Sequence, residues 1–321
     1  MNRVDVVGLG SCTVDFFAIV PKLIGADEKI NAERLEIHAG GVTANNLTQV
    51  ARLGAPTGWF GLIGDDANAR IIRDAFIADE MDVSAIEQVK GELSSITWIP
   101  VDAAGDRCIY MFPNVTAKIT PQQIRDRFGS YIRQARHFHT EASQLPMAPV
   151  LEAIHIAKDS GVRVIFDLDV SPEDFVKAGL GTDADLIEAL RCSDVLKPCK
   201  AAARIMTGET DPERMARKLR EYGPAIVALT MGSEGSVIAS PAGITHQPAY
   251  RVNVVDTTGA GDAYMGGLSF ALLMGWPHDE VAAFANACAA LCCTKVGARA
   301  MSSRTDVEAL IGKQSRTAAV S

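Results

Sequence analysis

A glycine-rich turn that carries two aspartates is the segment whose residue types point most directly to chemistry. It reads Asp256-Thr257-Thr258-Gly259-Ala260-Gly261-Asp262, after an extended, β-branched stretch and before a helical run that reaches residue 274. Gly259 and Gly261 can adopt positive φ, and the first N–H groups of the helix point out of its positively polarised end. The turn therefore predicts an anion site suited to a phosphate group.

Asp262 adds a second function, because a carboxylate beside an anion site weakens binding unless a proton must be removed there. A hydroxyl that attacks a phosphoryl group loses such a proton, so the pattern favours Asp262 as a general base. A structural interpretation stays open, since Asp, Thr and Gly commonly begin helices. Gly266 and Gly267 lie inside the helix, where each costs about 1 kcal/mol relative to alanine, which indicates close packing against other backbone.

A second glycine turn lies near the N-terminus. Gly40-Gly41 opens an amphipathic helix over residues 43–53, and Asn45 comes one turn into it. Backbone N–H groups and a carboxamide at such a turn can bind a polyhydroxyl ligand, although the same residues also suit a plain helix start.

Taken together, the two turns resemble the signatures of the ribokinase or PfkB family of carbohydrate kinases. The stretch from Gly40-Gly41 through Gly64-Asp65 is similar to the first signature, and Asp256 through Asp262 is similar to the second. The similarity covers nearly the whole chain. It implies an ATP-dependent kinase that needs Mg²⁺ and transfers the γ-phosphoryl group of ATP to a hydroxyl, expected to be primary, of a small carbohydrate.

The resemblance also implies a role for each residue that matches a family position. The catalytic set comprises Asp262 as the base and the backbone N–H groups of Gly259, Ala260 and Gly261, which would stabilise the charge on the transferred group. The positions that bind sugar hydroxyls are matched by Asp15, Gly40, Gly41, Asn45 and, less closely, Glu141. The nucleotide positions are matched by Thr230, Gly232, Gly235 and Asn286. Asp256 and the Thr258 carbonyl, with backbone near Cys292, Lys295 and Gly297, resemble the monovalent-cation site, for K⁺, of many members.

The sequence departs from the family pattern in two places. Many members carry Asn-x-x-Glu after a Lys-Pro turn, where the amide and the carboxylate organise magnesium-bound water and phosphates. In this chain Cys199 follows Lys197-Pro198 and Ala202 takes the place of the glutamate. Either metal handling differs or activity is weak, with Lys200 a hypothetical phosphate contact and Asp169 a hypothetical contact to metal or sugar. Val42 stands where ribokinases proper usually have a lysine, which argues against ribose as the substrate.

Strands and helices alternate along the rest of the chain. The pattern predicts strands at residues 4–8, 57–62, 136–139, 162–167, 194–196, 225–230 and 236–239, and helices near 43–53, 68–80, 147–159, 183–191, 200–207, 212–222, 262–274 and 280–295. Such alternation is typical of a mainly parallel sheet with helices on both faces, whose ligands bind beyond the carboxyl ends of the strands. The resemblance specifies this as a ribokinase-like three-layer α/β/α sandwich, a single domain over residues 1–312 followed by a frayed tail at 313–321.

Two segments interrupt the alternation, at about 14–38 and 95–113. They read as extended pieces without crossover helices and carry Phe16, Phe17, Trp98, Tyr110 and Phe112. In the family the corresponding segments form a small β-sheet lid that often makes a dimer contact, so we expect a homodimer through the lid. Closure of a lid would exclude water, which competes as phosphoryl acceptor. A plain excursion packed on the main domain is the alternative.

Composition narrows the function classes. The chain has 321 residues, 48% of them hydrophobic, and a net charge of -8, which argues against a nucleic-acid partner. No apolar run approaches the roughly 20 residues of a membrane helix and the N-terminus does not read as a signal peptide, so we expect a cytoplasmic enzyme of a small sugar. The seven cysteines form no CxxC pair. They, like His137 and His139, are expected to be structural.

Three other functions remain as alternatives. A dinucleotide-binding oxidoreductase is suggested by Gly8-Leu9-Gly10, but Thr13 occupies the position of the third glycine, and a strand-like run ending at Pro21 replaces the expected helix. A non-catalytic sugar or nucleotide sensor on the same scaffold would not need Asp262. A nucleoside kinase of the same family is the main alternative for the substrate.

Overall fold

A mostly parallel sheet forms the centre of the molecule. The computed structural model describes residues 4–320, with side chains to residue 314. Eight strands of this range follow the order β14-β13-β12-β11-β10-β9-β1-β4. Their bounds are β1 (Val6–Gly8), β4 (Thr57–Trp59), β9 (His137–Ala142), β10 (Arg163–Leu168), β11 (Val195–Pro198), β12 (Ile226–Thr230), β13 (Ser236–Ser240) and β14 (Gly243–Gln247). Only the pairings of β13 with β12 and with β14 are antiparallel.

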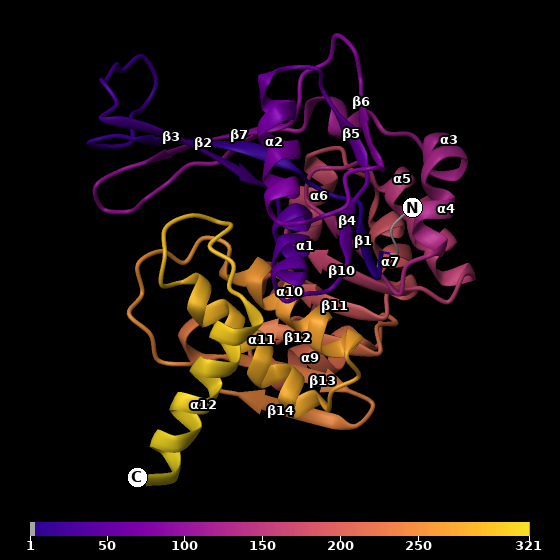
Figure 1. The fold of residues 1–321 in the computed structure, drawn as a ribbon, viewed down its shortest axis with the longest axis vertical. Coiled ribbons are helices and arrows are strands. Elements are labelled where there is room, and N and C mark those ends of the chain that lie inside the picture. The colour runs from indigo at the N-terminus through magenta and orange to yellow at the C-terminus, as the bar shows by residue number, and fades with distance from the viewer. Residues whose placement is uncertain (1–3, 321) are drawn as a thin grey trace.

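Helices cover both faces of this sheet and make the three layers that the sequence predicts (Figure 1). One layer contains α1 (Val42–Arg52), α2 (Ala67–Ala78), α10 (Ala260–Leu273) and α11 (His278–Cys292). The other contains α4 (Gly129–Arg133), α5 (Met147–Asp159), α7 (Asp183–Cys192), α8 (Lys200–Thr207) and α9 (Pro212–Arg220). Helix α10 packs against α1 and α11, and a Cβ on Gly266 would meet the Asn46 carbonyl at 2.7 Å. Gly266 therefore lets the backbones of α10 and α1 approach closely, as its place inside a helix had indicated.

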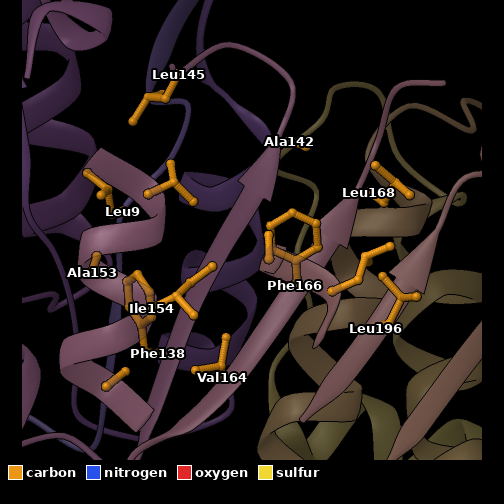
Figure 2. Close-up of a cluster of buried hydrophobic side chains, with 14 of the residues drawn as sticks. Leu9, Phe138, Ala142, Leu145, Ala153, Ile154, Val164, Phe166, Leu168 and Leu196 are labelled. Atoms are coloured by element: carbon orange, nitrogen blue, oxygen red, sulfur yellow. The ribbon is translucent and has the colours of Figure 1, made fainter. Parts of the chain in front are cut away.

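The alternation of side chains along β9 separates a core face from a polar face. Phe138 and Ala142 point toward α5, where they join Leu9, Ile154 and Phe166 in the cluster of Figure 2. On the opposite face, His137 and His139 both hydrogen-bond the Ser269 hydroxyl of α10, at 3.1 and 2.7 Å. This buried contact fits the structural role expected for the two histidines. Polar groups farther along the same face reach the carboxyl ends of the strands, where the glycine turns lie.

A second sheet, with the order β3-β2-β7-β8, projects from the body beside α2 (Figure 1). It consists of β2 (Thr13–Ile19), β3 (Arg34–Gly40), β7 (Ile96–Val101) and β8 (Tyr110–Phe112). The two interrupting segments therefore do form a lid, with β2 and β7 paired in parallel at its centre. We call residues 102–109, which join β7 to β8, the lid hairpin.

The remaining elements connect these parts. They are β5 (Gly61–Ile63), β6 (Ile86–Gln88), η1 (Asn114–Lys118), α3 (Pro121–Gln123), η2 (Ile124–Phe128), α6 (Pro172–Lys177), η3 (Gly232–Glu234) and α12 (Arg304–Val320). The strand predicted at 57–62 is divided into β4 and β5, because Gly61 has φ 147° and redirects the chain toward β6. Helix α12 includes most of the segment predicted as a frayed tail, and Ser321 lies outside the described residues.

Candidate active site

The Asp256–Asp262 turn has the geometry of an anion site. Helix α10 begins after Gly259, which has φ 79° and whose missing Cβ would collide with the Ala298 carbonyl. Asp256 orders the turn from below, because its two oxygens accept the N–H groups of Thr258 and Gly297, each at 2.9 Å. Although partial burial opposes the shift, these N–H groups hold the pKa of Asp256 below its ordinary value.

Asp262 lies in the first turn of α10, partly buried at the edge of the turn. Its Oδ2 accepts a hydrogen bond from Asn45 Nδ2 at 2.8 Å. Burial raises the pKa of Asp262 well above its usual range; Asn45 lowers it, and the nearby carboxylates of Asp169 and Asp167 raise it. A carboxylate with a raised pKa is a stronger base, so Asp262 is suited to accept a proton from a hydroxyl.

The predicted acceptor-binding residues gather on the other side of Asp262. A Cβ on Gly40 would collide with the Asp15 carboxylate, and one on Gly41, which has φ 98°, would lie 2.6 Å from the Ser11 carbonyl. Both positions therefore require glycine, because neighbouring atoms leave no room for a side chain. Asp15 accepts a 2.7 Å hydrogen bond from Thr13 Oγ1, and burial raises its pKa. Asp15 comes from β2 of the lid and Asn45 from α1, so the predicted acceptor-binding residues come from both the lid and the body.

Glu141 is fully engaged in internal hydrogen bonds. Its buried carboxylate accepts the Ser11 N–H at 3.0 Å, the Thr43 N–H at 2.8 Å, the Thr43 hydroxyl at 2.6 Å and the Ser143 hydroxyl at 2.5 Å. Four donors at one carboxylate fix the start of α1 against β9. The position of Glu141 therefore supports the glycine turn, and its predicted contact with the sugar stays a prediction.

The residues predicted for the nucleotide surround the turn after β12. Thr230 ends that strand, Gly232 has φ 62°, and Gly235 has φ 95° with no room for a Cβ beside the Gln247 carbonyl. Asn286 lies behind the turn, where its Nδ2 donates to Ser236 Oγ at 2.6 Å and to the Ala282 carbonyl at 2.8 Å. The four residues thus cluster at one end of β12 and β13, with the Asn286 amide nitrogen engaged internally.

A buried ion pair beneath the anion turn is a feature that sequence reasoning missed. Lys197 Nζ lies 2.8 Å from Asp167 Oδ1, and an ideal Cβ on Gly261 would be 3.7 Å from Nζ. Although burial opposes it, the carboxylates of Asp167 and Asp169 raise the pKa of Lys197, which therefore stays charged. Although Asp169 is exposed, partial desolvation and the Asp167 carboxylate raise its pKa. The sequence feature that could have indicated this ion pair is Lys197-Pro198 at the end of a strand.

The Cys199 turn itself offers little to a metal or a phosphate. Cys199 Sγ accepts the Ala202 N–H at 3.4 Å as the N-cap of α8, and burial raises the pKa of its thiol. Lys200 is exposed at the start of that helix. The contact of Asp169 with a metal or a sugar stays a prediction.

The lid hairpin reaches the anion turn from above. Arg107 Nη1 donates to the Thr258 hydroxyl at 3.2 Å, a contact between residues 151 positions apart. The Thr258 carbonyl accepts a weak hydrogen bond from the Cys292 thiol at 3.6 Å. The predicted cation-site residues therefore lie together, and a guanidinium from the lid lies beside them.

The chain is similar to known carbohydrate and riboside kinases. The pfkB family carbohydrate kinase model matches residues 3–306. The aminoimidazole riboside kinase of Salmonella typhimurium is 30% identical over 275 residues, 81% of this chain and 83% of the relative. The Arabidopsis thaliana ribokinase solved with ribose and ATP has a TM-score of 0.84 at 26% identity, over 96% of this chain and 99% of that one. A putative ribokinase II from E. coli in complex with ATP and Mg²⁺ gives 0.84 at 24% identity, over 97% and 99%.

Fold, site and comparisons agree on the class of reaction. The sheet with its lid is ribokinase-like, and the anion turn with its aspartate lies at the carboxyl ends of the strands. The chain therefore belongs to the pfkB family of carbohydrate kinases, phosphotransferases that use an alcohol group as acceptor.

Proposed function

We propose that this protein phosphorylates an uncharged small carbohydrate at a primary hydroxyl, with ATP as donor and Asp262 as general base. The observation that carries the proposal is the position of Asp262, between the anion turn of α10 and the acceptor-side residues Asp15 and Asn45. A nucleoside is the main alternative acceptor, because a riboside kinase is among the similar proteins.

In the proposed reaction the acceptor hydroxyl gives its proton to Asp262 while its oxygen attacks the γ-phosphorus of ATP and ADP leaves. N–H groups at the start of α10 stabilise the charge on the transferred group, since they have no intrahelical partner. Of the three predicted donors, Ala260 also donates to the Thr257 carbonyl at 3.2 Å. Arg107 would close over the same group from the lid hairpin, a second positive contact for the transferred phosphoryl.

The acceptor is proposed to be uncharged because of the charges around it. Asp15 and Asp262 both lie on the acceptor side, and their ionised carboxylates would repel a sugar acid or a sugar phosphate. Within residues 4–320, the cations nearest this side are already engaged: Arg299 with Asn45 and the Gly40 carbonyl, and Lys197 with Asp167. Neutral hydroxyls, in contrast, can donate to both carboxylates.

Metal ions would assist at two places. Mg²⁺ neutralises charge on the phosphates of ATP. The residues present fit it only in part, because Cys199 and Ala202 offer no oxygen, so we assign Asp169 to orient magnesium-bound water. A K⁺ ion near Asp256 and the Thr258 carbonyl is also part of the proposal.

A cytoplasmic location is part of the proposal as well. In the described part of the chain, every helix is too short or too polar to span a bilayer.

The direct test measures ADP release with pentoses, ketohexoses, sugar acids and nucleosides as acceptors. Neutral pentoses or ketohexoses should support turnover and sugar acids should not. Asp262→Asn should lower kcat by about 100- to 10,000-fold, the usual contribution of a general base. Unchanged turnover in this variant would refute the base. Binding of a sugar without turnover of any acceptor would favour the sensor alternative.

We also propose that the lid joins two copies of the chain. The strand register places Phe16, Ile37, Trp98 and Tyr110 on one face of the lid sheet, opposite the face of Asp15. Trp98 and Tyr110 are 41% and 55% exposed. That face carries no charged residue, and a second lid would cover it symmetrically. Sedimentation should show a dimer that Trp98→Glu dissociates; a monomeric native protein would refute the contact.

A further inference from the structure

A chain of hydrogen bonds connects a buried arginine to the base. Arg299 Nε donates to Asn45 Oδ1 at 2.9 Å, and Asn45 Nδ2 donates to Asp262 Oδ2 at 2.8 Å. Arg299 Nη2 also donates to the Gly40 carbonyl at 2.9 Å. Three segments that are distant in sequence thus meet at the side-chain amide of Asn45.

The chemistry of the two outer residues determines how this amide points. A guanidinium can only donate hydrogen bonds, so it requires the amide oxygen, and an ionised carboxylate can only accept them, so it requires the amide nitrogen. Without Arg299 the amide could rotate and present its oxygen to Asp262, which would replace an attraction by a repulsion. The arginine is therefore what makes Asn45 a donor to the base.

We propose that Arg299 is a positioning residue for catalysis: it locks the Asn45 amide with its nitrogen toward Asp262, so that one oxygen of the base is held and the other is free for the acceptor hydroxyl. This inference rests on the proposed role of Asp262 as the base. It assigns to Arg299 no contact with substrate.

Arg299 is retained in an environment that is unfavourable for a charge. Its Nη1 is buried and has no hydrogen-bond partner among the described residues, and burial lowers the pKa of the guanidinium. The Phe76 ring lies under the guanidinium, 5.3 Å from its carbon. An unpaired buried donor costs about 1–3 kcal/mol, and an apolar side chain of similar size would avoid that cost. A role in packing alone therefore does not explain an arginine here.

The backbone around Arg299 is held by separate contacts, which allows a matched control. Arg52 Nη1 donates to the carbonyls of Arg299 and Met301, both at 3.1 Å, and the Gln49 side chain pairs with the backbone of Ser302. Arg52 also pairs with Asp79 on the surface. Arg52→Ala thus loosens the same loop without touching Asn45 or Asp262.

The direction in which the pKa of Asp262 should move without Arg299 follows from the charges that face Asp262. Its pKa is affected by Asp167 and Asp169 of the β10 edge, Lys197 of β11 and Asn45 of α1, and Cys292 of α11 faces it as well. Asn45 is the hydrogen-bond donor that opposes the two carboxylates. If the amide is no longer held, the carboxylate loses this stabilisation, its pKa rises, and a higher pH is needed to ionise the base.

The experiment measures kcat/KM against pH for the native enzyme, Arg299→Met and Arg52→Ala, with the best acceptor of the panel. Arg299→Met should move the acid limb to higher pH and lower the rate at least tenfold on that limb, whereas Arg52→Ala should leave the limb in place. Arg299→Lys, measured in case the methionine variant does not fold, should move the limb in the same direction. An unmoved limb in the folded Arg299 variants, or an equal movement in Arg52→Ala, would overturn the proposal.

A double-mutant cycle separates the proposed route from a direct field effect. In an Asn45→Ala background, Arg299→Met should produce no further movement of the limb, because Arg299 acts through the amide. Additive movements would contradict this. Asp262→Asn is measured in parallel: full activity there means that the base assignment itself has failed, whereas an inactive Asp262→Asn with an unmoved Arg299→Met limb refutes only the positioning role.

Discussion

Lys197 and Asp167 form a buried ion pair at 2.8 Å directly beneath the anion turn, with both side chains at most 6% exposed. The lysine comes from the end of β11 and the aspartate from the end of β10, two neighbouring strands. The pair places a positive charge below Gly261 in a chain that lacks the Asn-x-x-Glu residues.

Lys197→Met should strongly destabilise the protein, because it leaves the Asp167 carboxylate buried without a counter-ion. Breaking such a pair costs about 3–5 kcal/mol, whereas replacing both partners by apolar residues restores much of the loss. Urea unfolding of Lys197→Met and of Lys197→Met/Asp167→Leu measures both. If the double variant were less stable than the single one, the ion pair would not be the reason for the loss.

Arg107→Ala should lower kcat/KM by about 10- to 100-fold, because a charge-assisted hydrogen bond contributes about 1.5–3 kcal/mol. The physical reason is the contact of the lid hairpin with Thr258, which places the guanidinium over the anion turn. Arg34→Ala removes another lid arginine, one that pairs with Glu36, and should leave the rate unchanged. Equal losses in both variants would indicate a general effect on the lid.

The protein should lose stability as the pH is lowered, because His137 and His139 are buried and neutral in the folded state. Burial lowers the pKa of His139 to about 3 and that of His137 well below its usual value. The unfolded chain binds protons at these sites below about pH 6.5 while the native state does not, so His139 costs about 1.4 kcal/mol per pH unit from there toward pH 3. His137 adds a loss in the same direction. The stabilisation is present above pH 6.5 and is lost on acidification.

The measurement is the free energy of unfolding at several pH values between 7 and 4.5, for the native protein and His139→Gln. Glutamine keeps a polar contact with Ser269 but does not titrate, so the variant should lose less stability on acidification. Parallel curves for the two proteins would rule out His139 as a source of the pH dependence.

Gly259→Ala should damage both stability and turnover. The backbone at Gly259 has φ 79°, and a Cβ there would collide with the Ala298 carbonyl, so the turn must deform. Gly312→Ala is the matched control, since no atom lies within 4 Å of its Cβ position in α12 and alanine favours a helix by about 1 kcal/mol. Thermal unfolding and ADP release should show a loss only for the first variant.

Local patterns in the sequence were enough to predict the class of fold. The alternation of strands and helices predicted the parallel sheet, and the two interruptions together with the family resemblance predicted the lid. These predictions succeed because strand, turn and helix preferences act over a few residues. Where a single backbone angle decides, as at Gly61, the sequence pattern failed and one predicted strand became two.

Contacts between distant residues were decided by the tertiary structure alone. Asn45 and Asp262 are 217 positions apart, and nothing local to either residue indicates that they hydrogen-bond. The same holds for Arg299, which no pattern singled out, and for Glu141, which accepts hydrogen bonds from Ser11 and Thr43, 130 and 98 positions away.

The sequence by itself therefore predicted that a carboxylate follows an anion turn, and its resemblance to the pfkB family implied that a hydroxyl is phosphorylated. Only the tertiary structure decided what surrounds that carboxylate: an amide held by a buried arginine, a lysine paired from below and an arginine from the lid. The physical reason is that turn geometry is a property of adjacent residues. The pKa and orientation of a base, in contrast, depend on charges and donors that only folding brings near.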